Sequence, residues 1–239
     1  QVIGKDNLRF HAAIWPGMLL AANLPLPKTV FVHGFLTVDG QKISKTIGNV
    51  IDPVELVKKY GSAHSTGSPQ AGTDAVRYYL LREVPPFEDG DFSYEKFENL
   101  YNSDLANGLG NFAARVLTLG EKLGKIEVDF KKDVLEKVSA EVEKAKDLIG
   151  EKLDGFRFNE ATDAIWKLIH FGDAYINEEK PWEKENKKAL INLVVILDNV
   201  AALLKPFLPE TAEKITSAIT WEGKKTLRVK KIENLFPRI

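Results

Sequence analysis

The feature that most constrains the fold is the hydrophobic pattern from residue 94 onward, where apolar side chains recur with the period of an α-helix. Short polar breaks divide this part into four or five amphipathic stretches. These stretches cover residues 94–123, 133–153, 159–178, 183–205 and 209–218. Because helices joined by short loops pack antiparallel to their neighbours, the pattern predicts an antiparallel helical bundle. The basic segment at residues 224–231 is expected to form a solvated strand or the edge of a sheet.

The part of the chain before the bundle has a mixed helix and strand pattern. Asp6 is placed to cap a helix. The apolar face of this helix carries Leu8, Ala12, Trp15, Leu19 and Ala22. The string "TVFVHGFLTV", residues 29–38, predicts a buried strand that bends at Gly34. Asp52 and Pro53 then mark the start of another helix.

Together the two patterns predict an α/β fold followed by an all-α fold. We expect an α/β domain at residues 1–60, a connector at residues 61–93 and a helical domain at residues 94–239. Because the chain opens on Gln1 inside what reads as a strand-to-helix unit, we also expect that an upstream portion of the protein is missing from it.

Composition excludes several classes of protein and site. The chain has 239 residues, with 33 Lys and Arg against 34 Asp and Glu, so a surface that binds nucleic acid must be a local patch. The absence of cysteine excludes disulfides and cysteine-based metal sites in this chain. Apolar runs such as Leu193–Leu197 are far too short to cross a bilayer, so no membrane partner is expected.

The string "DGQKISKTIG", residues 39–48, places Lys42 and Lys45 in a loop between two glycines. The loop follows the predicted strand and precedes a helix start, a position where α/β sheets bind phosphates. One interpretation is a mobile clamp on a polyphosphate, and the other is an ordinary solvated turn. The loop is not a Walker A motif, because G-x-x-x-x-G-K-[ST] does not occur in the sequence.

The string around this loop favours the first interpretation. "HGFLTVDGQKISKTIGNVIDP", residues 33–53, resembles the KMSKS signature loop of class I aminoacyl-tRNA synthetases. "GKDNLRFHAAIWPGMLLAANLPLPKTVFVHGFLTVDG", residues 4–40, resembles methionyl-tRNA synthetases. The similarity continues through "DAVRYYLLREVPPFEDGDFS", "NSDLANGLGNFAARVL" and "INEEKPWE", and it covers nearly the whole chain. The resemblance implies the end of a Rossmann-like catalytic domain, a connector and a helical anticodon-binding domain, in a cytoplasmic enzyme.

Enzymes of this family join methionine to ATP as an adenylate and then transfer methionine to its tRNA. The protein supplies no nucleophile, so catalysis rests on positioning and on charge stabilisation. The resemblance implies that Lys42 and Lys45 neutralise charge on the phosphates and that Ser44 adds a hydroxyl donor. The implied ATP-binding residues are Gly4, Asp6, His33, Leu36 and Lys45. The implied partners are methionine, ATP with its Mg²⁺ and tRNA(Met), and no zinc is expected in this chain.

The predicted first helix contains Phe10, His11 and Trp15, of which the last two are four residues apart and share a face. Without the resemblance, a buried structural histidine would explain this pattern. With it, the three residues are expected to form the wall of the methionine pocket, because a thioether packs favourably against aromatic edges.

The predicted helix at residues 104–123 carries a polar stripe of Asn107, Asn111 and Arg115, roughly 120° around the helix from its apolar stripe. The apolar stripe consists of Leu105, Leu109, Phe112, Val116, Leu119 and Leu123. Such a stripe is commonly a solvated face, but amides and a guanidinium also suit the edges of unpaired RNA bases. The resemblance implies that these residues read the methionine anticodon. Trp182 either closes one end of the bundle or stacks on an anticodon base, as the resemblance implies. His170 is expected to be a core residue.

The sequence departs from the family pattern at several places. Ile43 and Thr46 replace the usual methionine and final serine of the loop, and residues 62–72 form an insertion, read as an inserted loop. No HIGH-like motif occurs, so the chain is expected to be a C-terminal portion that is inactive alone. A non-catalytic tRNA-binding protein and a synthetase for another amino acid stay open as alternatives. The oligomeric state cannot be read from the sequence.

Overall fold

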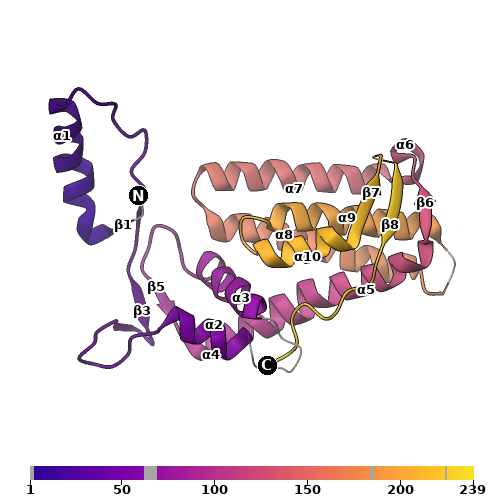
Figure 1. Cartoon of the computed structure of the whole chain (residues 1–239), viewed down its shortest axis with the longest axis horizontal. Helices are drawn as coiled ribbons and strands as arrows, with labels where there is room; N and C mark the ends of the chain where they lie inside the picture. The colour runs from indigo at the N-terminus through magenta and orange to yellow at the C-terminus, as the bar shows by residue number, and fades with distance from the viewer. Residues whose placement is uncertain (1–2, 62–68, 184–185, 224) are drawn as a thin grey trace. The chain divides into compact units, whose positions relative to one another are not determined.

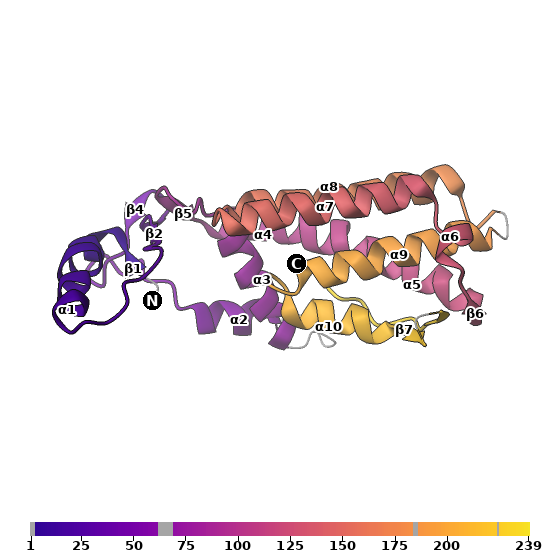
Figure 2. The same cartoon turned by 90° about the horizontal axis from the view of Figure 1, so that it is seen from above.

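A computed structural model describes residues 3–61, 69–183, 186–223 and 225–239 of the chain. The chain divides into two compact units (Figures 1 and 2). The N-terminal unit comprises Gln1–Val50 and Glu83–Ser93, and the helical unit comprises Ile51–Arg82 and Tyr94–Ile239. These boundaries differ from those expected of the domains, because residues 51–60 and most of the connector belong to the helical unit. The functional boundaries at residues 60 and 93 stay a prediction.

In the N-terminal unit, strands β1 (Ile3–Gly4) and β2 (Val32–His33) pair in parallel. The helical segment between them begins with a 3-10 turn at Lys5–Asn7, continues as a π-helix at Phe10–Ile14 and ends as helix α1, Trp15–Ala21. The predicted helix is therefore present, but its predicted cap is wrong. Gly4 holds the N-cap position, and Asp6 lies within the first turn.

A second small sheet has the strand order β4-β3-β5. Strand β3 (Leu36–Val38) pairs antiparallel with β4 (Gln41–Lys42) and parallel with β5 (Gly90–Phe92). The predicted single strand at 29–38 is thus two strands, β2 and β3, that part at Gly34, where the bend was expected. A Cβ at residue 34 would lie 2.0 Å from the carbonyl oxygen of Glu88, so only glycine fits this approach.

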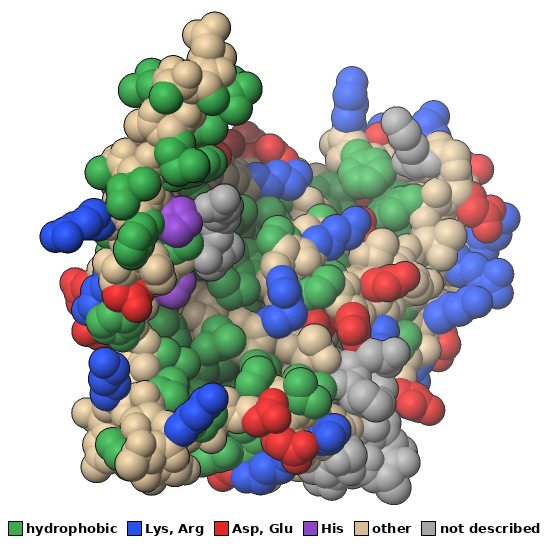
Figure 3. All heavy atoms as spheres, turned by 60° about the vertical axis from the view of Figure 1, so that its left-hand side comes forward, with side chains coloured by type: hydrophobic (Ala, Val, Ile, Leu, Met, Phe, Trp, Pro, Cys, Tyr) green, Lys and Arg blue, Asp and Glu red, His purple; other side chains and the backbone are tan. Residues whose placement is uncertain are grey.

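Many large apolar side chains of the N-terminal unit lie at its surface, as the space-filling view shows (Figure 3). They include Leu8, Phe10, Ile14, Met18, Leu20, Leu24 and Leu26, all from one end of the chain. Among the described residues of this unit, the buried apolar side chains are Val38 and Phe92. Apolar exposure on this scale is typical of a surface that packs against another protein element.

The helical unit begins with helices α2 (Pro53–Gly61) and α3 (Pro69–Arg82), which pack against each other. The Asp52 carboxylate accepts a hydrogen bond from the backbone N–H of Val54 at 2.8 Å and caps α2, as predicted. Residues 62–68 of the expected inserted loop lie outside the described residues. Residues 69–72 are not a loop, because they form the first turn of α3, and Gly72 is buried against the backbone of α2.

A continuous helical path then runs from residue 94 to residue 123, as predicted. It consists of α4 (Tyr94–Leu100), the π-helix Tyr101–Gly110, α5 (Asn111–Gly120) and a 3-10 turn, Glu121–Leu123. The apolar stripe predicted for this path faces the core, since Leu105, Leu109, Phe112 and Val116 are at most 1% exposed. In the π-helix, each residue turns the chain by a smaller angle than in an α-helix. The sequence pattern did not indicate this change.

Four further helices complete the predicted bundle: α7 (Glu136–Asp154), α8 (Phe158–Glu179), α9 (Lys187–Leu204) and α10 (Pro209–Ala218). Helices α7 and α8 lie side by side along their length (Figures 1 and 2). Helix α9 packs against α5, α8 and α10, so it forms the centre of the core. His170 is exposed on α8, so its expected place in the core is wrong, whereas Trp166 is buried.

A three-stranded antiparallel sheet flanks the bundle, with β6 (Lys125–Glu127) and β7 (Ile219–Glu222) on either side of β8 (Thr226–Val229). The basic segment therefore contains a strand, as predicted, and its side chains Lys225, Arg228 and Lys230 are exposed to solvent, but the strand is not an edge. It is the central strand, and its Leu227 and Val229 side chains are buried. Within the part of the chain that the structure describes, no helix is both long and apolar enough to span a membrane.

Candidate functional site

The lysine loop is a hairpin that projects from β3. Asp39 and Gly40 turn the chain with positive φ angles of 49° and 72°, and Lys42 lies in the returning strand β4. Asp91, from β5, accepts hydrogen bonds from the Thr37 hydroxyl at 2.6 Å and the Gly40 N–H at 2.8 Å. This carboxylate therefore fixes the direction in which the hairpin leaves the sheet.

The side chains of Lys42 and Lys45 are exposed on the same hairpin. Among the described residues, neither ammonium group lies within 4.0 Å of a carboxylate. The Ser44 hydroxyl oxygen accepts a hydrogen bond from the Thr46 N–H at 3.2 Å, and its own proton is available for donation. The hairpin thus presents two unpaired cations and one hydroxyl, which is a suitable set for a polyanion.

Asn49 organises this hairpin, although the sequence analysis assigned it no role. Its Oδ1 accepts a hydrogen bond from the Ser44 N–H at 2.8 Å, and its Nδ2 donates to the Lys42 carbonyl at 3.1 Å. The amide therefore ties Asn49 back to Lys42 and Ser44 and closes the loop that contains Lys45. The only signal in the sequence is its place directly after Gly48, which has a φ of 77°.

Gly4 and His33, two of the residues predicted to bind ATP, are direct partners in the β1–β2 ladder. A Cβ at residue 4 would lie 3.1 Å from the Asp6 Oδ1, so the Asp6 carboxylate folds back over Gly4. His33 Nδ1 pairs with the carbonyl oxygen of Gly34 at 2.9 Å, and Leu36 begins the neighbouring strand β3. The structure therefore brings Gly4, Asp6 and His33 together.

His11 and Trp15 line a small cavity of about 110 Å³. Their rings meet edge to face, with centroids 6.3 Å apart, and His11 Nδ1 lies 3.1 Å from the carbonyl oxygen of Asn7. The remaining lining residues are Ile3, Pro27, Thr29, Val30 and Phe31. The cavity is therefore mainly apolar and has a histidine at its wall, as a site for a small amphiphilic molecule requires.

Phe10 does not line this cavity; its side chain is 56% exposed. Phe31 lies on the cavity wall instead, and its ring packs 5.6 Å from that of Phe87. From the sequence, Phe31 was expected to lie in a buried strand and was not predicted to belong to a site. Alternation along a strand could not have indicated it, because the consecutive residues Thr29, Val30 and Phe31 all line the cavity and precede β2.

The polar stripe of the helical unit is present on the surface. Asn107, in the π-helix, and Asn111, in α5, are exposed, and Arg115 is half-buried. Asn107 Oδ1 accepts a hydrogen bond from Arg238 Nε at 2.9 Å. Arg238 is 131 residues away in the sequence, so no local pattern could have indicated this contact.

Arg115 and Trp182 are brought together. The Arg115 guanidinium carbon lies 5.8 Å from the centroid of the Trp182 ring, which is 48% exposed. Trp182 therefore does not plug the bundle. Two residues of α8 hold the guanidinium: Asp173 Oδ1 lies 3.3 Å from its Nη1, and Asn177 Oδ1 accepts from its Nη2 at 2.8 Å.

Burial raises the pKa of the Asp173 carboxyl above its ordinary value, while the positive charge of Arg115 lowers it. Asp173 and Asn177 are four residues apart on one helix face, a spacing that could have marked them as a pair. Their contact with Arg115 was not predicted, because the local sequence does not indicate that this face of α8 packs against α5.

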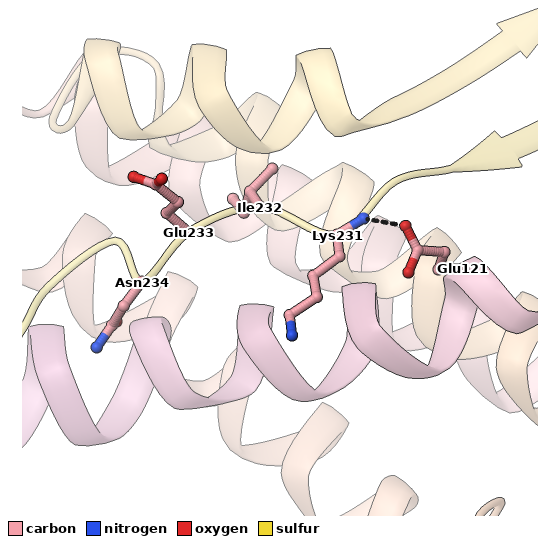
Figure 4. A pocket seen from close by; sticks show the side chains of 5 residues that line it. All are labelled: Glu121, Lys231, Ile232, Glu233 and Asn234. Carbon is pink, nitrogen blue, oxygen red and sulfur yellow. Dashed lines mark hydrogen bonds between the residues drawn. The ribbon is translucent and has the colours of Figure 1, made fainter. Parts of the chain in front are cut away.

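A cleft of about 630 Å³ lies elsewhere in the helical unit, and none of the predicted site residues lines it. Its lining residues are Glu121, Lys231, Ile232, Glu233 and Asn234 (Figure 4). The Glu121 carboxylate accepts a hydrogen bond from the Lys231 N–H at 3.1 Å, and Lys231 and Glu233 point to opposite sides of the chain. This cleft is therefore separate from the sites predicted from the sequence.

Within the described ranges, no group of three or more His, Asp and Glu side chains could hold a metal ion.

Comparison with known proteins agrees with both halves of the chain. Residues 1–117 match the family model described as tRNA synthetases class I (M), and residues 136–235 match the anticodon-binding domain of tRNA ligase. These matches confirm the predicted fold class: the end of a class I catalytic domain followed by a helical anticodon-binding domain.

Curated relatives cover the chain from end to end. The methionine–tRNA ligase of Clostridium acetobutylicum is 44% identical over 100% of this chain and 39% of its own length. The methionine–tRNA ligase of Thermotoga maritima is 38% identical over 94% of this chain and 36% of its own length. The chain thus spans about two fifths of the length of the curated relatives that it matches.

Solved structures give the same result. Mycobacterium tuberculosis methionyl-tRNA synthetase in complex with methionyl-adenylate has a TM-score of 0.83 and 31% identity, over 99% of this chain and 49% of that chain. The apo form has a TM-score of 0.81 and 28% identity, over 100% of this chain and 49% of that chain. By sequence and by fold, the chain belongs to the methionyl-tRNA synthetase family of class I tRNA synthetases.

Proposed function

We propose that this chain is part of a methionine–tRNA ligase, which activates methionine with ATP to methionyl-adenylate and transfers it to tRNA(Met). The observation that carries the proposal is the content of the N-terminal unit. This unit holds an exposed lysine hairpin, the Gly4–His33 strand pair and an aromatic-walled cavity. The solved relative that contains methionyl-adenylate supports the same reaction.

In this proposal, the hairpin acts on the phosphates of ATP. Lys45, the residue expected to contribute most, and Lys42 neutralise the negative charge that builds on the leaving pyrophosphate, and Ser44 donates its hydroxyl proton. Both ammonium groups are exposed and unpaired among the described residues, so no internal ion pair must be broken first. Mg²⁺ would arrive with ATP as part of the substrate. Asn49 would hold the hairpin in the shape that presents both lysines.

The adenosine part of ATP is assigned to Gly4, Asp6, His33 and Leu36. The missing side chain of Gly4 leaves the β1–β2 edge open to a close approach, and the Asp6 carboxylate beside it is an acceptor for ribose hydroxyls. Leu36 would contact the adenine through its backbone.

Methionine is assigned to the cavity of His11 and Trp15. A thioether gains from contact with aromatic edges, and the T-shaped His11–Trp15 pair offers both an edge and a face. Phe10 was also predicted to contact methionine. It precedes His11 in the chain, but its side chain is exposed, so it would contact methionine only by folding over the bound ligand. Phe31 is the residue that the structure adds to the wall.

The helical unit is assigned to the anticodon of tRNA(Met). Asn107, Asn111 and Arg115 offer amide and guanidinium groups to base edges, and the half-exposed Trp182 offers a ring on which an unpaired base can stack. In domain terms, residues 1–60 would serve adenylate chemistry, residues 94–239 would serve anticodon binding, and residues 61–93 would connect them.

Methionine-dependent exchange between ATP and pyrophosphate tests the proposal, and the complete gene product is the right material because the chain spans two fifths of its relatives. We expect exchange with methionine and little with isoleucine, valine or leucine. Exchange with another amino acid would assign the chain to a different class I synthetase. No exchange, together with tight binding of a CAU stem-loop, would instead indicate a non-catalytic tRNA-binding protein.

A further inference from the structure

The last residues of the chain, Asn234–Ile239, form a segment that lies along the π-helix at Tyr101–Gly110; we call it the C-terminal strap. Leu235 and Phe236 are buried, and the Phe236 ring meets that of Tyr101 edge to face at 5.9 Å. At the far end, the Asn102 side chain donates to the Ile239 carbonyl at 2.9 Å and accepts from the Ile239 N–H at 3.1 Å. Both ends of the strap are therefore fixed on the helix.

Arg238 lies between these two anchors, and its Nε–H donates to the Oδ1 of Asn107 at 2.9 Å. A guanidinium has only donors, so it can face only the oxygen of a carboxamide. This settles the orientation of the Asn107 side chain, which an isolated amide would leave open. The Asn107 oxygen is engaged by the strap, and the two N–H groups of Nδ2 point elsewhere on an exposed surface.

We propose that Arg238 is a positioning residue, which holds the Asn107 carboxamide with its oxygen against the strap and its two Nδ2 N–H donors available to an anticodon base. This inference rests on the proposed anticodon role of Asn107. A group that turns its donors toward a base favours a base edge with adjacent acceptors. On its Watson–Crick edge, cytosine presents two neighbouring acceptors, N3 and O2, whereas uracil places an N–H between its two carbonyl oxygens. The strap therefore tunes the surface toward cytosine, the first base of a CAU anticodon.

The alternative is that Arg238 contacts an RNA phosphate directly. The two roles differ in their consequences, because a phosphate contact strengthens binding to every loop, whereas a base-edge contact changes the preference among loops. A double-mutant comparison with Asn107 separates them, since a positioning residue acts only while its target is present.

The first test needs no RNA. The side-chain amide protons of Asn107 are followed by two-dimensional ¹H–¹⁵N NMR in the wild-type protein, Arg238→Ala and Arg238→Lys. We expect Arg238→Ala to shift the Asn107 resonances and Arg238→Lys to shift them less, because the lysine ammonium is also only a donor. Unchanged Asn107 resonances in Arg238→Ala would show that the contact does not form in solution and would overturn the proposal. The backbone signals of Leu235 and Phe236 report whether the strap stays in place.

The second test measures binding of labelled stem-loops with CAU and UAU anticodons by fluorescence anisotropy at two salt concentrations. We expect Arg238→Ala to reduce the preference for CAU over UAU by roughly 3- to 10-fold, the size of one hydrogen bond. In an Asn107→Ala background, Arg238→Ala should leave that preference unchanged, and Arg238→Lys should retain it in the wild-type background. An equal loss of affinity for both loops in both backgrounds would assign Arg238 to a phosphate. A stem-loop with a scrambled anticodon loop is measured with the wild-type protein first. If that protein does not prefer CAU over the scrambled loop, the proposed anticodon role itself fails, and this outcome is visible before any variant is made.

Discussion

Arg115 places its guanidinium carbon 5.8 Å from the centroid of the Trp182 ring, while Asp173 and Asn177 hold its two terminal nitrogens from the neighbouring helix α8. The pair is therefore ordered before any ligand binds. A cation over one face of an indole leaves the other face for a stacked base, and it keeps a charged donor beside the place where the edge of that base would lie. Preorganisation of this kind lowers the entropy lost on binding.

Removing the Trp182 ring should weaken RNA binding without harming the fold. The ring is 48% exposed, so Trp182→Ala removes a stacking platform and little core packing. We expect a loss of about 1–3 kcal/mol in binding free energy for a CAU stem-loop, which is roughly 5- to 150-fold in Kd. Fluorescence anisotropy measures this, and Phe87→Ala, which removes another exposed ring, is the control. Equal affinities of the wild-type protein and Trp182→Ala would remove the stacking role.

Removing the Lys45 charge should slow adenylate formation in the complete ligase. We expect Lys45→Ala to reduce the rate by about 10²- to 10³-fold, the usual loss for one charge-stabilising donor, with little change in methionine affinity. Single-turnover formation of methionyl-adenylate measures the chemical step. Lys28→Ala removes an exposed lysine of the same unit and should change neither quantity. A collapse of methionine affinity with an intact chemical step would contradict the assignment to the phosphates.

Two glycines of the bundle should respond to alanine in opposite directions. A Cβ at Gly172 would lie 2.4 Å from Cζ of Phe112, which is fully buried, so Gly172→Ala forces α8 away from α5. We expect it to lower the free energy of unfolding by about 1–3 kcal/mol. A Cβ at Gly150 on α7 meets no atom within 4 Å, and Gly150→Ala should raise the same quantity by about 0.4–1 kcal/mol. Urea unfolding measures both, and a stabilised Gly172→Ala would show that the α5–α8 contact can relax.

The helices were predictable because their apolar positions repeat locally. Residues 94–123 were predicted as one helix from apolar residues spaced three or four positions apart, which is a local feature of the sequence. The burial of Leu105, Leu109 and Phe112 follows from the same spacing. The π-helical turns at Tyr101–Gly110 were not predictable, because their hydrogen bonds depend on packing rather than on residue type. Likewise, residues 69–72 were expected to belong to an inserted loop, but the close approach of Gly72 to α2 makes a helical turn favourable there.

The sites show the same division between local and distant contacts. Residues within one short motif, such as Lys42, Ser44 and Lys45, are brought close together by the local sequence alone, and their role stays a prediction. Residues that hold a predicted residue from another element could not, because Asp173 and Arg238 reach their targets only through the tertiary fold. Phe10 shows a limit of local patterns, since its neighbours His11 and Trp15 line a cavity that it does not line, and its contact with methionine stays a prediction.

The stability of the helical unit should depend on pH through Asp198. Burial raises the pKa of the Asp198 carboxyl above its ordinary value, and the hydrogen bond that Trp221 Nε1 donates to it at 3.0 Å lowers it. A carboxyl whose pKa is higher in the folded protein holds its proton more tightly there than in the unfolded chain. The stabilisation from this proton is present at low pH and is lost as the pH rises from about 4 through the folded-state pKa.

Asp198→Asn removes this dependence but keeps an oxygen that can accept the Trp221 N–H. The free energy of unfolding of the variant, minus that of the wild-type protein, should therefore increase between about pH 4 and pH 7. Urea unfolding of both proteins across this range measures the difference. Trp221→Phe supplies a control. Without the indole donor, the pKa of Asp198 should rise further, and the free energy of unfolding should fall more steeply with pH than in the wild-type protein. In the Asp198→Asn background, Trp221→Phe should add no pH dependence. A difference that stays constant or falls with pH would show that the charge of Asp198 is solvated in the fold, and that burial beside Trp221 does not set the stability of this part of the bundle.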